Sequence, residues 1–334
     1  MLDERAAPTI SAPSAEVSVP RRTGPLAGVL KFIRRKPLGA FGFLLVFFLF
    51  AMTLGTPKAE FGTPSLPDRP FGFQLGSPWM ERYNQEDQFY TADGGLAQFA
   101  SPSADHIFGT DRAGRDIWSR IVVGARRSLF VGIWALVIAT LFGSAVGVIS
   151  GYFGKWLDTV VQRFSDAIQS FPPLIALILI VSINPLTSGD TSSLLMIAVA
   201  LGLVGIPSVQ RITRGVVLAT REQQYVEAAR VIGASDARIM RHDILPNIMA
   251  SIIVVFSTGI GVVILAEAAL SFVVPDKLPF GTSWGFMLSE SYSSIGDKPY
   301  PGLFSAGAIA TAVLAFNLAG DALRDVLDPR LRLQ

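Results

Sequence analysis

The stretch SLFVGIWALVIATLFGSAVGVIS, from Ser128 to Ser150, contains 23 residues and no charged side chain. An α-helix rises about 1.5 Å per residue, so this stretch can cross the hydrocarbon core of a bilayer, which is about 30 Å thick. Five further apolar runs without a charge occur in the chain. They span residues 39–55, 167–183, 191–209, 247–266 and 299–320. The sequence therefore predicts an all-α membrane protein with six transmembrane helices.

The composition of the whole chain agrees with a bilayer environment. Half of the 334 residues are apolar and 16% are charged, whereas about 25% of residues are charged in an ordinary soluble domain. The mean hydropathy is +0.46. The net charge of +2 is too small to indicate a nucleic-acid partner. The absence of cysteine excludes disulfides and cysteine-ligated metals, and the two histidines, His106 and His242, lie far apart.

The distribution of Lys and Arg predicts how the helices are oriented. Seven of these residues lie in the first 37 positions, six in the loop 210–246 and three after residue 320. Both termini and this loop are therefore expected in the cytoplasm. The segment 57–127 carries eight, but segments longer than about 60 residues largely escape the rule. We expect it outside the membrane, with an amphipathic interfacial helix over Asp111–Arg127.

These boundaries divide the chain into five expected parts. They are a cytoplasmic N-terminal tail (1–37), a first transmembrane helix (38–56), an extracytoplasmic loop (57–127), a five-helix core (128–322) and a cytoplasmic C-terminal tail (323–334). The first helix is expected to be a retained signal anchor, because its leader is long and no small-residue cleavage site follows it. Pro172 and Pro173 predict a bend in the third helix, because proline removes a backbone hydrogen bond.

The cytoplasmic loop contains QQYVEAARVIGASDARIMRHDILP, residues 223–246. Its first half has a helical pattern, and Gly233 can end that helix in a left-handed conformation. Ser235 can cap a second short helix, which Pro246 follows. The sequence thus predicts a helix–turn–helix between the fourth and fifth crossings. It is either a solvated connector or a docking surface, because Ala228 and Ala229 leave a flat face for another protein.

Several motifs now show a resemblance to a known family. Glu227-Ala228-Ala229, Gly233 and Leu245-Pro246, at this spacing, resemble the EAA loop (221–246) of ABC importer permeases. Other stretches are similar to the C-type permease subunit of dipeptide, oligopeptide and nickel importers. They are GTDRAGRD (109–116), GARRSL (124–129), GYFGKWLD (151–158), ILAEAALSF (264–272), TSWG (282–285) and AFNLAGDALRDVLDPR (315–330). The similarity covers about residues 30–330, with a local departure at Asp243.

The resemblance implies a fold, a location and a set of partners. The implied fold is that of a type I ABC importer permease, and the implied location is the cell membrane. The resemblance also implies that the chain is a transport subunit and not an enzyme. The implied partners are a second homologous permease, two ATPase subunits and an extracytoplasmic substrate-binding protein. The residues implied to couple to an ATPase are Glu227, Ala228, Ala229, Arg230, Gly233, Leu245 and Pro246. This chain has no G-x-x-x-x-G-K-[ST] motif, so ATP and Mg are expected on the ATPases, with no cofactor on this chain.

Charged residues at membrane depth are candidates for a gate or pathway. Glu267 lies about twenty residues into the fifth helix, Asp166 begins the third, and Asp321 ends the sixth. Each of these three residues could instead have a structural role. Asp166, for example, could pair with Arg163, three residues before it.

Three other functions compete with a peptide permease. A secondary transporter would need intramembrane coupling charges and usually two similar halves, and the chain has few such charges and no internal repeat. A membrane enzyme would need a catalytic cluster, which the sequence does not suggest. The cargo could also be an oligosaccharide, an opine or a metal chelate.

Overall fold

The computed structural model describes residues 33–34, 36–54, 83, 85–91, 93–183, 191–275 and 282–327. The chain divides into two units, Met1–Pro37 and Leu38–Gln334. Among the described residues, the only β-pairings are two isolated bridges, Tyr90–Leu96 and Thr110–Asp116. The prediction of an all-helical protein is therefore confirmed for this part of the chain.

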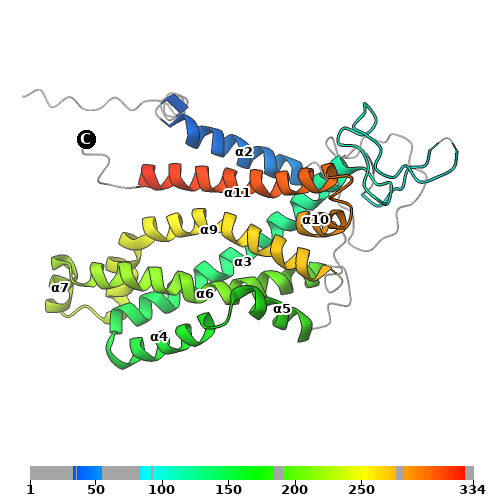
Figure 1. Ribbon diagram of the computed structural model, residues 1–334. Helices are drawn as coiled ribbons and strands as arrows, with labels where there is room; N and C mark the ends of the chain where they lie inside the picture. The colour runs from blue at the N-terminus through cyan, green and yellow to red at the C-terminus, as the bar shows by residue number, and fades with distance from the viewer. Residues whose placement is uncertain are drawn as a thin grey trace, which may run out of the picture. The chain divides into compact units, whose positions relative to one another are not determined.

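The helices from α3 onward follow one another closely along the chain, whereas residues 55–116 separate α2 from α3 (Figure 1). The helices are α2 (Pro37–Leu54), α3 (Ile117–Phe153), α4 (Lys155–Gln169), α5 (Pro173–Ile183), α6 (Thr191–Arg221), α7 (Gln224–Val231), α8 (Asp236–Arg238), the π-helix η1 (Ile239–Ile244), α9 (Leu245–Val273), α10 (Trp284–Tyr292) and α11 (Tyr300–Leu327). The elements from α8 to α9 form one continuous helix, Asp236–Val273.

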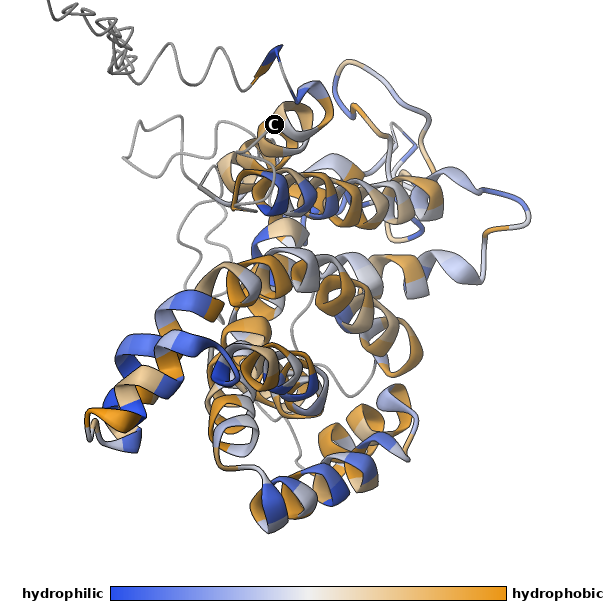
Figure 2. Ribbon diagram, turned by 90° about the vertical axis from the view of Figure 1, so that its left-hand side faces the viewer, coloured by the Kyte–Doolittle hydropathy of each residue, from blue (hydrophilic) through white to orange (hydrophobic). Residues whose placement is uncertain are grey.

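Four helices in the described residues are long and apolar enough to span a membrane: α3, α6, the continuous helix Asp236–Val273, and α11. The pair α4 and α5 makes a fifth candidate, but the two are bent by 81° at their break. The bend confirms the prediction from Pro172 and Pro173. The expected first crossing corresponds to α2, a shorter apolar helix. Figure 2 shows hydrophobic residues over most of the long helices, whereas α4, the lowest helix in both views, mixes hydrophobic and hydrophilic residues.

The packing of α3 against α6 depends on glycine. A Cβ atom added at Gly143 would lie 2.8 Å from the Cβ of Val209, and one at Gly147 would lie 2.8 Å from the carbonyl oxygen of Gln210. A Cβ atom added at Gly132 would likewise lie 3.0 Å from Cγ1 of Ile264 in α9. Small residues let helix backbones approach closely, which gives dispersion contact in a membrane where no hydrophobic force acts between helices.

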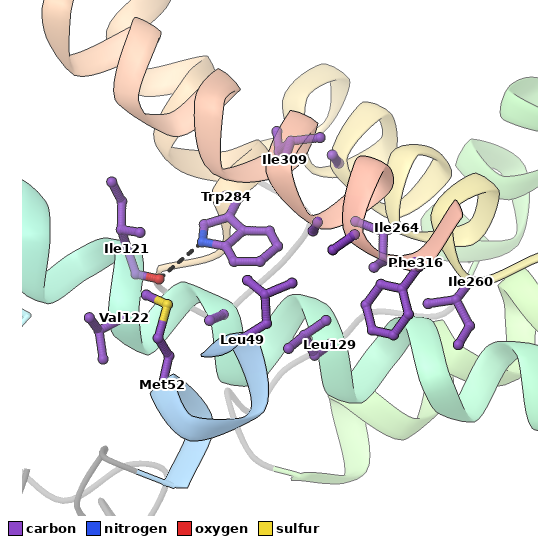
Figure 3. Packing of buried hydrophobic residues seen from close by; sticks show 14 of the residues in the cluster. Leu49, Met52, Ile121, Val122, Leu129, Ile260, Ile264, Trp284, Ile309 and Phe316 are labelled. Atoms are coloured by element: carbon purple, nitrogen blue, oxygen red, sulfur yellow. Dashed lines mark hydrogen bonds between the residues drawn. The ribbon is translucent and has the colours of Figure 1, made fainter. Parts of the chain in front are cut away.

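The main core joins α2, α3, α9, α10 and α11 (Figure 3). Trp284 is fully buried at its centre, and its indole Nε1 donates a hydrogen bond to the carbonyl oxygen of Ile121, at 3.0 Å. Leu49 and Met52 of α2 enter the same core. These contacts attach the first helix to the remainder of the bundle.

One prediction about this part of the chain was wrong. No separate interfacial helix covers Asp111–Arg127, because α3 begins at Ile117 and continues without a break to Phe153. Ile117 and Val122 are buried in the main core instead of facing lipid headgroups. Asp116 starts the helix by accepting a hydrogen bond from the backbone N–H of Ser119, at 2.8 Å. In addition, α11 continues to Leu327, past the expected end of the core at residue 322.

Candidate functional site

The loop 221–246 contains α7, which is followed by the turn at Gly233 as the sequence predicts. Gly233 has a φ of 83°, a left-handed conformation that glycine adopts at little cost. The N–H of Ala234 donates to the carbonyl of Ala229, and the N–H of Gly233 donates to that of Arg230, both at 3.0 Å. These two bonds satisfy carbonyl groups that the helix end leaves free. The turn therefore has a defined geometry.

The second half of the loop differs from the prediction. Ser235 precedes α8, but its side chain makes no capping hydrogen bond. No separate short helix ends before Pro246, since the helix passes through η1 directly into α9. Pro246 lies inside this continuous helix, two residues after η1, and as a proline it donates no backbone hydrogen bond there. The side chain of Asn247 donates a hydrogen bond to the carbonyl of Asp243, at 2.6 Å, beside the change of helix type.

The EAA residues lie on different sides of α7. Glu227 and Ala228 are exposed, and Ala229 is half-buried. Arg230 is exposed, although its guanidinium carbon lies 5.5 Å from the ring centroid of Tyr152. At the other end of the loop, Leu245 is half-buried and Pro246 is exposed. The loop is thus fixed on one side and open on the other.

A small hydrophobic core holds the loop in place, and sequence reasoning did not identify it. Val226 of α7 is fully buried there. The other members come from α3, α6, η1 and α9: Val148, Tyr152, Val217, Ile239, Ile244 and Ile248. The sequence contained a signal for this core, because Val226 and Tyr225 are the two apolar residues between Glu222 and Ala228. The core makes the loop a packed element.

Two adjacent apolar residues project from the end of α7. Val231 is 82% exposed and Ile232 is 83% exposed. They follow the EAA residues and directly precede the Gly233 turn. Isolated exposed apolar residues are normal on a protein surface, but an adjacent pair on a helix tip is a candidate contact for another protein.

Polar side chains join α4 to α6. Arg214 donates two hydrogen bonds to the carboxylate of Asp158, each at 2.5 Å. Asp166 accepts from Arg211, at 2.8 Å, and not from Arg163 as the sequence suggested. Both side chains of the Asp166–Arg211 pair are about half exposed, at 54% and 49%.

A cluster of ion pairs lies at the other end of α3, where the GTDRAGRD motif precedes the helix. Arg120 is 1% exposed and pairs with Asp111, at 2.5 Å, and with Glu290 of α10, at 2.7 Å. Arg115 pairs with the same two carboxylates, at 2.9 and 2.7 Å. These four residues are called the outer ion cluster below, and they line a cavity of 340 Å³.

The carboxylates around Arg115 favour its charged form. Burial alone would lower the pKa of Arg115, but Asp111, Glu290 and Glu86 together raise it above its ordinary value. Two guanidinium groups face two carboxylates, so the cluster is formally neutral. Buried charges are tolerated when they are paired in this way.

The two remaining gate candidates lie in contrasting environments. Glu267 is 4% exposed, and its carboxylate accepts a hydrogen bond from Ser271, at 2.8 Å. It is buried within the chain and does not line an open path in this structure. Asp321, near the end of α11, is exposed.

Comparisons with known proteins agree with this arrangement. A family model described as the binding-protein-dependent transport system inner membrane component matches residues 143–333. A dipeptide transport system permease protein of Alkalihalophilus pseudofirmus is 42% identical over 231 residues, which are 69% of this chain and 74% of that protein. A glutathione transport system permease protein of Pectobacterium atrosepticum is 38% identical over 231 residues, covering 69% and 75% of the two chains. The glutathione transport system permease protein of Escherichia coli is 39% identical over 231 residues, covering 69% and 74%.

Proposed function

Because the chain belongs to the family of binding-protein-dependent transport system inner membrane components, we propose that it is the permease subunit of an ATP-driven peptide importer. The relatives transport dipeptides and glutathione by their names, which supports di- or oligopeptides as cargo. The chain would form half of the translocation pathway beside a second homologous permease. A substrate-binding protein would deliver the cargo from outside, and two ATPase subunits would bind ATP and Mg.

The proposed topology has six crossings and both termini in the cytoplasm. The four long helices and the bent pair α4–α5 supply five. The sixth is α2, whose 18 residues extend about 27 Å at 1.5 Å per residue, close to the thickness of a bilayer core. Residues 57–127 would then lie outside, and the loop 221–246 would face the cytoplasm with the tails 1–37 and 323–334.

We propose α7 as the coupling helix that contacts an ATPase. The observation that carries this proposal is the exposure of Val231 and Ile232 at its tip. Burying one such side chain stabilises a complex by about 1.5–3 kcal/mol. Glu227 would orient the helix through polar contacts, and Ala228 would allow a close approach. Gly233 and the loop core would hold the geometry while ATP-driven closure of the ATPases moves the loop.

The roles of the charged candidates remain predictions. Asp166 forms an exposed ion pair with Arg211. This ion pair could break and form again as a gate at the cytoplasmic end of the pathway. Asp321 is exposed near the end of α11 and could do the same. Glu267 would act only if the packing between α3, α9 and α10 opened.

The first test is a pull-down of the tagged chain from mild detergent, with mass spectrometry of what co-purifies. Recovery of a second permease and two P-loop ATPases supports the importer. Recovery of the chain alone, active in vesicles without ATP, would indicate a secondary transporter instead.

The docking face is tested with the double variant Val231→Asp/Ile232→Asp. It is expected to lose the ATPases while the second permease remains bound. The matched control is Ile295→Asp, an exposed isoleucine that follows α10 on the proposed outer side. Retention of both ATPases by the double variant would place the docking surface elsewhere. Glu227→Lys is expected to uncouple hydrolysis from uptake, and normal uptake by this variant would contradict the proposed role of Glu227.

A further inference from the structure

We propose that the cytoplasmic end of α3 receives the movement of the coupling loop directly, and that Tyr152 is the positioning residue that transmits it. This inference rests on the proposed function, because it names the route by which α7 moves a transmembrane helix. The chain itself connects the loop only to α6 and to α9. Transmission to α3 therefore depends on noncovalent contacts.

Tyr152 contacts both halves of the loop at once. Its hydroxyl donates a hydrogen bond to the carboxylate of Asp236, at 2.6 Å. Its ring lies 5.5 Å from the guanidinium carbon of Arg230. Arg230 belongs to α7, and Asp236 begins α8, on the far side of Gly233. A hydrogen bond to a carboxylate is stronger than a neutral one, and a guanidinium over an aromatic face is attracted to it. One side chain of α3 thus holds the turn from both sides.

A second contact comes from the end of α6. The guanidinium of Arg221 donates to the carbonyl oxygen of Gly151, at 2.8 Å, and to that of Tyr152, at 3.3 Å. The last carbonyls of a helix have no partner within the helix, so Arg221 supplies one from outside. Gly151 also allows α3 to approach Val217, whose Cβ would lie 3.0 Å from a Cβ at that position. The end of α3 is therefore tied to the start of the loop.

The buried face of the loop completes the attachment. Val226 of α7 and Tyr152 belong to the same hydrophobic core. Any movement of α7 that keeps this core intact must carry the end of α3 with it. From there, α3 continues unbroken along α6 to its other end, where Arg120 joins the outer ion cluster. α3 thus connects the loop with the opposite end of the bundle.

The test uses Tyr152→Phe, which removes the hydroxyl and keeps the ring. In the reconstituted complex with its ATPases, we expect about a fivefold fall in substrate transported per ATP hydrolysed, or about 1 kcal/mol by RT ln 5, the usual net value of one hydrogen bond. ATPase binding is expected to stay unchanged. Tyr292→Phe is the matched control, because this exposed tyrosine of α10 lies outside the loop and its side chain makes no hydrogen bond among the described residues. Asp236→Asn keeps an acceptor oxygen and is expected to retain more coupling than Asp236→Ala.

A distance measurement separates transmission from a general loss of structure. The chain has no cysteine, so spin labels can be placed at exposed positions without a background. The distance between labels at Leu314 of α11 and Leu141 of α3 reports the movement of α3. The distance between labels at Leu314 and Leu203 of α6 reports the movement of α6. Tyr152→Phe is expected to reduce the ATP-dependent change in the α3 distance and to leave the change in the α6 distance unaltered.

Two outcomes would overturn the inference: a coupling ratio like that of the unchanged chain, or equal losses of movement in α3 and α6. An equal fall in coupling for Tyr292→Phe would also overturn it. Failure of the unchanged chain to bind any ATPase is a different result, because it would refute the proposed function itself.

Discussion

Replacing Arg120 by methionine tests whether the outer ion cluster stabilises the fold. The change leaves one guanidinium, that of Arg115, to neutralise Asp111 and Glu290, so the formal charge of the cluster falls from 0 to −1. Removing one partner of a buried ion pair costs about 3–5 kcal/mol. The side chain of Glu290 is 32% exposed, so water partly solvates its charge. We therefore expect the free energy of unfolding to fall by about 3 kcal/mol, at the lower limit of this range.

The assay is thermal denaturation of the chain purified in mild detergent. At about 2 °C per kcal/mol for a chain of this size, the expected fall in Tm is about 6 °C. The double variant Arg120→Met/Glu290→Gln restores a neutral cluster and is expected to recover about half of the loss. Arg112→Met is the control, because this arginine is exposed and makes one hydrogen bond to Ser293. An unchanged Tm for Arg120→Met, or a double variant no better than the single one, would refute the reasoning.

Three further results are expected. Trp284→Phe loses the hydrogen bond to Ile121 and part of a buried ring, and should lower stability by about 2 kcal/mol in the same thermal assay; an unchanged Tm would contradict this. Gly147→Val should cost about 1–3 kcal/mol through overpacking, whereas Gly215→Ala, which meets nothing within 4 Å, should not destabilise. Gly233→Ala places a Cβ at positive φ in open space, which costs about 1–2 kcal/mol locally, so transport per ATP should fall while Tm changes little.

The sequence predicted those features that depend on neighbouring residues. Uncharged runs of sufficient length located the long helices, because a helix in lipid must be apolar along its whole length. The Gly233 turn and the bend at Pro172 follow from backbone properties of single residues. The cytoplasmic side of the loop 221–246, which its arginines and EAA residues indicate, stays a prediction.

Features that depend on distant residues escaped prediction. Arg120 and Glu290 lie 170 positions apart, and nothing in the local pattern of either indicates the other. For this reason, the arginines near the start of α3 suggested a helix at the membrane surface, although the cluster neutralises two of them inside the protein. Likewise, Asp166 pairs across helices with Arg211, 45 positions away, in place of its neighbour Arg163. The role of Tyr152 was equally hidden, since its partners come from two later elements.

The absence of a break between the second half of the loop and α9 has a mechanical consequence. From Ile239 in the loop to Glu267, the helix is continuous and, at 1.5 Å per residue, about 40 Å long. Moving as one body, this helix would convert a tilt at its loop end into a displacement at its far end. A tilt of about 5° at the loop end would displace the far end by about 4 Å, roughly the width of a methyl group. Small strokes of the loop would therefore be amplified geometrically, without any residue in between having to change its conformation.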